Sequence, residues 1–316
     1  MARATVFQRI GEYRIERVLV RSSTFLEYEG EHLVLPRRAL IKVMATGVAP
    51  LPVLREACIL EALHHPGVVR VYESGILADR RPWFARELVE GTSIAATLAP
   101  GAIDRIDIIA LLRDLAEVLS HAHVRGIVHA NLRPDKILLT NRMRGYPLCI
   151  PDWSDARAHD TTSSPPQPSV ASRYYTAPQV VTGEGLDDRS DVFSLGVVAY
   201  RLLTGVLPFD GKVAMTIDGQ VQHVPTEVRC PDAPRELTTM VDQMLARDRW
   251  DRPSASEVHS DLSWLAEVLA GPARNVRIRR PRWTPQLDFT PHDRRNDPEL
   301  EVDSVIVDPG DETRNS

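Results

Sequence analysis

Residues 121–141 carry polar side chains at spacings that could do chemistry. Their sequence, HAHVRGIVHANLRPDKILLTN, has a helical apolar rhythm up to Gly126, then a short extended run, then a polar loop that ends at Ile137. Proton transfer at neutral pH needs a titratable side chain, and the amide of Asn131 cannot accept a proton there. A divalent metal ion needs oxygen ligands, and the ammonium group of Lys136 would repel it. The loop therefore resembles catalytic machinery whose working groups have been exchanged.

The whole chain has the composition of a globular protein. Its 316 residues are 43% hydrophobic and 26% charged, enough for one large or two closely packed domains. No apolar run approaches the roughly 20 residues of a membrane span, and no apolar signal segment is visible, so a cytoplasmic location is expected. The net charge of −5 argues against general nucleic-acid binding. We expect ordinary buried thiols, not a disulfide framework or a zinc site, at Cys58, Cys149 and Cys230.

Two kinds of local pattern divide the chain. From residue 13 to about residue 90, short β-branched or aromatic runs between polar turns predict strands. One helix interrupts them over 52–64, where Leu54, Cys58 and Leu63 repeat at helical spacing. Amphipathic helices dominate afterwards, and they are expected at about 104–125, 189–204, 234–246 and 254–270. The sequence therefore predicts a small sheet lobe followed by a larger, mainly helical lobe.

Two segments differ in composition from the rest. The centre of 151–178, HDTTSSPPQPS, is polar and proline-broken, which predicts an irregular and mobile loop. After residue 271, five arginines (274, 277, 279, 280 and 282) precede a run rich in Asp and Glu over 297–312. Such a tail buries too little apolar surface to offset its ordering entropy, so it is expected to be disordered or to dock on something. The expected divisions are an N-terminal extension over 1–10, the two lobes over 11–90 and 91–270, and the charged tail over 271–316.

Seven separated motifs occur in an order that resembles a eukaryotic-like serine/threonine protein kinase domain of the kind also found in bacteria. In chain order they are ALIKVM, LREACILEALHHPGVVRVYESG, VHANLRPDKILL, IPDWSDAR, SRYYTAPQV, RSDVFSLGVVAYRLLTGVLPFDG and DRWDRPSASEV. The resemblance covers about residues 11–270. It implies an α+β, bilobal protein-kinase-like fold, with a small N-terminal antiparallel β lobe containing one helix and a larger helical C-terminal lobe.

The resemblance also identifies the positions that would do kinase chemistry. Family catalysis rests on positioning and on neutralising phosphate charge. Asn131 stands where the family has its catalytic aspartate, and Lys136 stands where it has a metal-binding asparagine. Lys42, Glu56 and Asp152 are retained. We expect Asp152 to form a salt bridge with a lysine in place of the metal, and the Lys42–Glu56 pair to act either as a strut between elements or as active-like machinery.

The nucleotide pocket is altered as well. Three positions that match the family's phosphate-loop glycines hold residues with a Cβ, which hinders close approach of the backbone to phosphate. The degenerate pocket comprises Val20, Ser22, Phe25, Glu27, Leu40, Arg86 and Leu138. A buried carboxylate without a partner is costly, so we expect Arg86 to pair with Glu27 or Glu56 and fill the site. Alternatively, Glu27 points to solvent because the strand register differs by one residue.

Other matched positions imply structural roles. These are His129, Trp153, Gln179, Asp191 and Arg252. Gln179 replaces a glutamate that would pair with Arg252, so a hydrogen bond is expected instead of an ion pair. Ala130 replaces the arginine that would read a phosphorylated loop, so that form of regulation is not expected, and Arg133 replaces the loop lysine.

The substitutions favour a pseudokinase, which is a catalytically inactive kinase-like domain that acts as a scaffold or allosteric partner without Mg-ATP as a cofactor. One alternative is a serine/threonine kinase with residual or atypical phosphotransfer, in which Asp152 and Lys42 hold one metal ion and ATP. Another is a phosphopeptide-binding or nucleic-acid-binding module that uses the arginine-rich tail. Protein partners are expected at the former substrate groove, near Tyr174 and Tyr175, or on the 274–316 tail.

Overall fold

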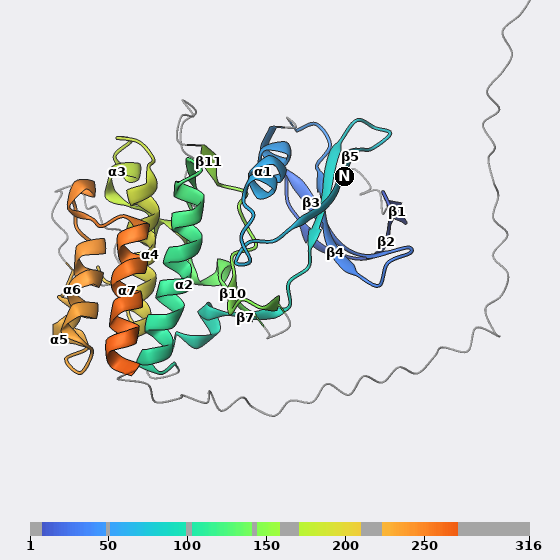
Figure 1. Cartoon of the computed structure of the whole chain (residues 1–316). Coiled ribbons are helices and arrows are strands. Elements are labelled where there is room, and N and C mark those ends of the chain that lie inside the picture. Colours follow the sequence, from blue (N-terminus) through green and yellow to red (C-terminus); the bar gives the residue numbers. More distant parts are fainter. Residues whose placement is uncertain are drawn as a thin grey trace, which may run out of the picture. The chain divides into compact units, whose positions relative to one another are not determined.

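The computed structural model describes residues 8–48, 51–98, 103–140, 144–158, 171–209 and 223–270. Within these ranges a sheet lobe precedes a helical lobe, as the sequence pattern predicts (Figure 1). The centre of the predicted 151–178 loop and the predicted 271–316 tail lie outside the described residues. No helix in the described ranges has the length and hydropathy to cross a membrane.

The first lobe is built on a six-stranded antiparallel sheet with the order β1-β2-β3-β4-β6-β5. Its strands are β1 Arg9–Ile10, β2 Tyr13–Arg21, β3 Phe25–His32, β4 Arg38–Met44, β5 Val71–Ile76 and β6 Pro82–Glu87. The register places Glu27 opposite Lys42, and Lys42 opposite Phe84. Directly opposed residues share one face of a sheet, so the altered pocket positions on β3 and β4 face the same side.

Helix α1, Leu51–Ala62, packs beside this sheet, but its inward face differs from the predicted one. The buried stripe repeats at helical spacing through Val53, Glu56, Leu60 and Leu63. Leu54 and Cys58 lie outside that stripe and are exposed. The expectation of a buried thiol is therefore wrong for Cys58, although Cys149 and Cys230 are buried. The error arose because the inward stripe contains a charged residue, Glu56, which an apolar pattern does not reveal.

The helices of the second lobe are α2 Arg105–His123, α3 Pro178–Val181, α4 Asp188–Thr204, α5 Thr226–Arg229, α6 Arg235–Met244 and α7 Ala255–Ala270. The four long helices, α2, α4, α6 and α7, lie close to their predicted positions, while the short helices α3 and α5 were not predicted. Helix α4 begins with a capping box between Asp187 and Ser190 and ends at Gly205, whose φ of 77° suits a residue without a Cβ. Helix α2 packs against α4 and α7 (Figure 1), and the core of the lobe lies between them.

Short strands bracket the two segments that carry the candidate site. They are β7 Gly91–Ser93, β8 Ile127–Val128, β9 Leu138–Thr140, β10 Leu148–Cys149 and β11 Arg157–Ala158. Strand β9 pairs with β7 and β10, while β8 pairs with β11. The loop between β8 and β9 is thereby held against the segment between β10 and β11. Four 3-10 helices complete the description: η1 Ile94–Thr97, η2 Pro134–Lys136, η4 Ser172–Tyr174 and η5 Arg249–Asp251.

Arg144 joins the two lobes. Its Nε donates to the carbonyl oxygen of Pro66 at 2.9 Å and its Nη2 to that of Val68 at 2.6 Å, both in the loop that follows α1. Its Nη1 forms an ion pair with Glu87 at the end of β6, and only 10% of the Arg144 side chain is exposed. One guanidinium group therefore ties the β9–β10 connection to two segments of the sheet lobe.

We predict that Arg144→Ala lowers the free energy of unfolding by about 1.5 kcal/mol, because a charge-assisted pair and two hydrogen bonds are lost together. Urea unfolding measures this change, and amide exchange should accelerate in residues 64–70. Arg125→Ala is the matched control, since this exposed arginine donates one side-chain hydrogen bond, to the carbonyl oxygen of His121 at 3.0 Å. Equal stability of the Arg144 and Arg125 variants would contradict the joining role.

Candidate active site

Helix α4 fixes the loop that follows β8. The Asp191 carboxylate, which is fully buried, accepts the backbone N–H of His129 at 2.7 Å and that of Ala130 at 2.9 Å. It also lies 2.9 Å from Nε2 of His123 on α2. Ala130 has a φ of 67°, a left-handed conformation that costs an L-residue free energy. The two hydrogen bonds to Asp191 hold this strained turn and thereby fix the direction of the loop that follows it.

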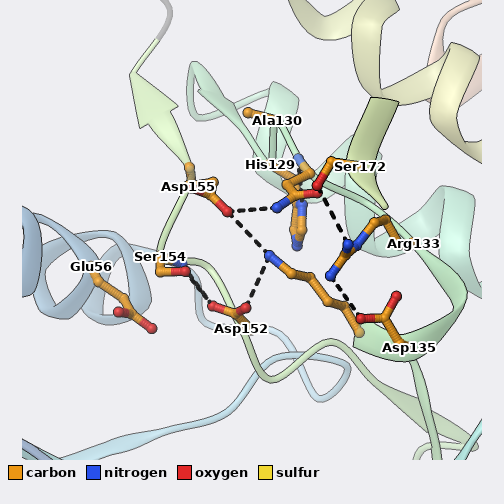
Figure 2. Close-up of polar contacts among 12 residues, drawn as sticks. Glu56, His129, Ala130, Arg133, Asp135, Asp152, Ser154, Asp155 and Ser172 are labelled. Carbon is orange, nitrogen blue, oxygen red and sulfur yellow. Dashed lines mark hydrogen bonds and ion pairs between the residues drawn. The ribbon is translucent and has the colours of Figure 1, made fainter. Parts of the chain in front are cut away.

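Lys136 lies between two carboxylates. Its Nζ is 2.9 Å from Oδ2 of Asp152 and 3.2 Å from Oδ2 of Asp155, and 10% of its side chain is exposed. Figure 2 shows Asp152 and Asp155 turned toward the same point in the site. The expected salt bridge between Asp152 and a lysine is therefore present, and Lys136 makes it. Within the described residues, no group of three or more His, Cys, Asp or Glu residues is arranged to hold a metal ion.

Asp155 is a member of this site that sequence reasoning missed. The Nδ2 of Asn131 donates to its Oδ2 at 2.7 Å, the same oxygen that faces Lys136. The signal was present in the sequence, because Asp155 follows Asp152 by three residues in PDWSDAR. Asn131 thus acts here as a hydrogen-bond donor, a role that a carboxylate at this position could not take.

The electrostatics of the site keep both carboxylates charged. Burial raises the pKa of Asp152, but Lys136, the hydrogen bonds from Ser154 and the more distant Lys42 outweigh it, so the net pKa falls well below the usual range. The Ser154 N–H and hydroxyl donate to Asp152 at 3.0 and 2.6 Å. Burial likewise raises the pKa of Asp155, while Lys136 and Asn131 lower it further than burial raises it. Asp152 and Asp155 therefore both carry a negative charge beside the single ammonium group of Lys136.

Lys42 forms a second ionic cluster. Its Nζ is 2.7 Å from Oε2 of Glu56 and 3.5 Å from Oε1 of Glu27, and it lies 3.9 Å from the centre of the Phe25 ring. Burial raises the pKa of Glu56. The side chain of Glu27 is 13% exposed and faces Lys42, so the alternative in which it points to solvent does not hold.

The expected ion pair of Arg86 is absent from the described residues. Arg86 is buried and its Nε has no hydrogen-bond partner. The strand register explains this, because Glu27 lies directly opposite Lys42 whereas Arg86 lies opposite Leu40. Lys42 therefore takes both carboxylates that were expected to reach Arg86.

The remaining pocket positions come from three strands and one turn. Val20 on β2 is 40% exposed, Leu40 on β4 is buried, and Leu138 on β9 is half-buried. Ser22 closes a tight turn, since its N–H donates to the carbonyl of Phe25 at 2.9 Å. The structure thus brings Phe25 and Glu27 onto Lys42, whereas no polar contact links Val20, Leu40 or Leu138 to that cluster.

His129 and Trp153 pack together behind the loop. Their ring centres are 4.7 Å apart in an edge-to-face arrangement, and both side chains are buried. Trp153 Nε1 donates to the carbonyl of Ile150 at 2.9 Å, a bond that phenylalanine could not make. Burial lowers the pKa of His129, so its ring is neutral at pH 7. The pair supports the segment that carries Asp152.

Gln179 and Arg252 make the expected hydrogen bond, with Arg252 Nη1 3.1 Å from Gln179 Oε1. Burial lowers the pKa of Arg252 to about 10, and backbone carbonyls accept three more of its N–H groups. The Gln179 Nε2 also donates to Asp187 and to Ser190, at 3.1 and 3.0 Å. The Gln179 amide thus accepts a hydrogen bond through its oxygen and donates through its nitrogen, whereas an ionised glutamate could only accept.

Arg133, Tyr174 and Tyr175 are the residues that the sequence analysis placed in the loop and at the expected substrate groove. Arg133 pairs with Asp135 at 2.7 Å and reaches Ser172 at 3.4 Å (Figure 2). Tyr175 is buried, and its hydroxyl accepts a hydrogen bond from Arg201 at 2.6 Å, so it does not offer a docking surface. Tyr174 is half-buried.

Comparison with known proteins agrees with this architecture. The protein kinase domain family model matches residues 41–264. Serine/threonine-protein kinase pkn2 of Myxococcus xanthus is 33% identical over 286 residues, which are 83% of this chain and 34% of that protein. PknB of Mycolicibacterium smegmatis is 31% identical over 280 residues, or 83% of this chain and 44% of that protein. The chain thus spans between about a third and less than half of the length of these relatives.

A solved structure shows the same fold. The autoinhibited serine kinase domain of the giant muscle protein titin superposes with a TM-score of 0.68 at 21% identity, covering 84% of this chain and 83% of that one. The fold expected from the motifs is thereby confirmed. By sequence and by fold, the chain belongs to the protein kinase domain family and is related to bacterial serine/threonine kinases.

Proposed function

We propose that this chain is a pseudokinase, a kinase-like domain that serves as a scaffold or allosteric partner and does not transfer phosphate from Mg-ATP. One observation carries the proposal: the Lys136 ammonium lies 2.9 and 3.2 Å from the carboxylates of Asp152 and Asp155. A positive charge of the chain itself thus neutralises Asp152, the carboxylate on which a kinase would place its metal ion, together with the neighbouring Asp155.

The residues present do not fit Mg-ATP. A magnesium ion needs oxygen ligands in octahedral geometry, and here it would have to displace the Lys136 ammonium group from Asp152, the one metal-ligand position that is retained. Lys42, which would hold the phosphates in the family, already contacts two carboxylates, and the Phe25 ring covers its Nζ. No phosphate could reach Lys42 without breaking this cluster.

Transfer of a proton from a substrate hydroxyl also lacks a general base. The Asn131 amide cannot take a proton from a substrate hydroxyl, and its Nδ2 is engaged with Asp155. Asp155 is itself held ionised by Lys136, and its low pKa makes it a weak proton acceptor.

A serine/threonine kinase with atypical phosphotransfer is the second candidate. Its relatives support it, because pkn2 of Myxococcus xanthus and PknB of Mycolicibacterium smegmatis are named serine/threonine-protein kinases. The Lys42–Glu56 contact at 2.7 Å and the ionised Asp152 also support it, since these are the retained members of the family site.

Thermal unfolding with nucleotide separates the two candidates. A ligand that binds only the folded state at 100 times its Kd adds about 2.7 kcal/mol and raises the midpoint. We expect no rise with ATP and either Mg²⁺ or Mn²⁺. The PrkC kinase of Bacillus subtilis serves as the positive control. A metal-dependent rise, followed by transfer of labelled phosphate to a protein substrate, would establish the second candidate instead.

The partner of the scaffold is proposed to be a protein. The 274–316 tail, outside the described residues, and the surface around Tyr174 are the positions proposed for its docking. The net charge of −5 supports a protein partner over a nucleic acid.

A further inference from the structure

Two histidine rings pack against each other at the junction of the lobes. His65, in the loop that follows α1, has its ring centre 4.9 Å from that of His121 on α2. The Tyr146 ring, from the β9–β10 connection, meets His65 edge-on with its centre 5.2 Å away. Only 7% of the His65 side chain is exposed. Because α1 belongs to the sheet lobe and α2 to the helical lobe, the His65–His121 pair lies across the boundary between them.

The hydrogen bonds of His65 fix its protonation state. Its Nδ1 accepts the backbone N–H of Gly67 at 2.9 Å, so this nitrogen carries a lone pair and the proton of the neutral ring is on Nε2. Nε2 lies 3.6 Å from Oε1 of Glu117 on α2. A second proton would have to bind at Nδ1, where it would face the Gly67 N–H, and two donors cannot form a hydrogen bond. The bond to Gly67 therefore exists only while His65 is neutral.

The turn at Gly67 fits closely against the helical lobe. A Cβ on this residue would lie 2.4 Å from a methyl carbon of Val118 on α2, far inside van der Waals contact. The Gly67 carbonyl accepts the N–H of Ile150 at 2.8 Å, and the carbonyls of the residues on either side accept hydrogen bonds from Arg144. Loss of the hydrogen bond from Gly67 to His65 would thus disturb the segment through which the lobes are packed.

His121 has little to stabilise a positive charge. Its Nε2 is buried, and no hydrogen-bond partner for this atom lies within the described residues. Burial is the largest cause that lowers the pKa of His121, followed by the nearby charge of Arg125. The neighbouring His65 and His64 act in the same direction, and Glu117 opposes them with a smaller effect. The His121 ring is therefore neutral at pH 7.

The carboxylate that faces His65 does not reverse this balance. Glu117 is 45% exposed on its side chain, so water screens its charge. Its Oε2 also accepts the Tyr146 hydroxyl at 2.8 Å, and burial raises the pKa of that hydroxyl, which keeps its proton. Burial lowers the pKa of His65 by more than Glu117 raises it, and Arg125 lowers it further. His65 is therefore also neutral at pH 7.

We propose that the His65–His121 pair is an acid-sensitive joint between the two lobes. While both rings are neutral, the loop over 64–68 stays packed on α2. When the pH falls, protons bind the histidines of the detached loop more readily than those of the packed one, so detachment is favoured while the rest of the domain stays folded. This joint acts whether or not the candidate active site transfers phosphate.

Hydrogen exchange tests the joint in the full chain. The readout is the protection of the peptide over residues 64–70, relative to an unstructured peptide at the same pH. A histidine in water has a pKa of about 6.5, so at about pH 5.5 it is about 90% protonated, which favours the detached state about tenfold for each ring. We expect protection to fall at least about tenfold between about pH 7.5 and about pH 5.5. The amides of α4 should remain better protected than the loop at both pH values.

Variants assign the titration to the two rings. His65→Asn keeps an acceptor for the Gly67 N–H, since an asparagine side chain binds the N–H two residues on, and His121→Phe keeps a ring. The double variant should retain its protection at low pH, and His121→Phe alone should lose about tenfold less than the parent chain. The matched control is His64→Asn, which changes an exposed histidine and should leave the fall in place.

Melting curves establish that the variants are folded, and the pH profile of the parent chain tests the joint without any variant. Constant protection of residues 64–70 in the parent chain would overturn the proposal. The same follows if the double variant loses protection as the parent does, or if His64→Asn abolishes the fall. Equal protection of the loop and α4 at low pH would mean that only global unfolding releases the loop, and that there is no separate joint.

Discussion

Lys136→Ala is expected to lower the free energy of unfolding by about 2.5 kcal/mol. Removing one partner from a buried ion pair costs about 3 to 5 kcal/mol, and that figure is reduced here because Asp152 and Asp155 are 34% and 30% exposed. The variant leaves two neighbouring carboxylates without their shared cation, so they repel each other. Chemical unfolding in urea at pH 7, followed by circular dichroism, measures the change.

The stability that the same variant loses is also predicted to depend on pH. The pKa values of Asp152 and Asp155 are lowered in the folded state, below the value of about 3.9 for an unfolded aspartate. Their contribution to stability is therefore complete above that value, and it is lost as the pH falls below about 4 toward the folded-state pKa values. Without Lys136 the pKa values rise, so the difference in stability between the parent chain and the variant should shrink between about pH 5 and pH 2.

Lys136→Arg is the matched control, because it keeps the positive charge between the carboxylates. Its loss should be about 1 kcal/mol or less, reflecting only altered geometry. The structural role of Lys136 would be refuted by an alanine variant as stable as the parent chain, or by one whose deficit does not change with pH.

The network around Lys136 shows which contacts of the site can be predicted from the sequence. The exchange at Lys136 and the retention of Asp152 are visible as residue types, and the motif order implies that they meet, so their salt bridge could be predicted. Asp155 was missed because no family role was assigned to that position. Its participation depends on the turn at Ser154, which brings two residues three apart toward one ammonium group.

The Lys42 cluster shows where the prediction failed. Residue types alone allowed Glu27 and Glu56 to neutralise either Lys42 or Arg86. The choice depends on strand register, which places Glu27 directly opposite Lys42 and Arg86 opposite Leu40. Register follows from the fit of whole strands, and a one-residue difference reverses every side chain, so it cannot be derived from one strand at a time.

Helix α1 shows a related limit for the fold. Its extent was predicted within two residues, but of the three residues of the predicted apolar stripe only Leu63 is buried, while Leu54 and Cys58 face solvent. The true inward stripe contains Glu56, whose burial is made possible by Lys42 on another element. A pattern of hydrophobic residues cannot anticipate a buried charge, because the compensating partner is distant in the sequence.

Asp191→Ala is expected to have the largest effect on stability, lowering the free energy of unfolding by about 4 kcal/mol. The change leaves the buried N–H groups of His129 and Ala130 without an acceptor, and each such group costs about 1 to 3 kcal/mol. It also removes the partner of His123. For a domain of this size the midpoint of thermal unfolding should fall by roughly 8 to 16 °C, measured by calorimetry.

Asp188→Ala is the matched control for this prediction. Asp188 is an aspartate of the same helix in its first turn, so its loss should cost at most about 1 kcal/mol through the helix dipole. Adding Ala130→Gly to the Asp191 variant should return about 1 kcal/mol, since glycine adopts the φ of 67° without a Cβ penalty. An Asp191 variant no less stable than the Asp188 variant would mean that α4 does not hold the loop. The position of Lys136 between its carboxylates would then have to be set by the short strands β8 and β9 instead.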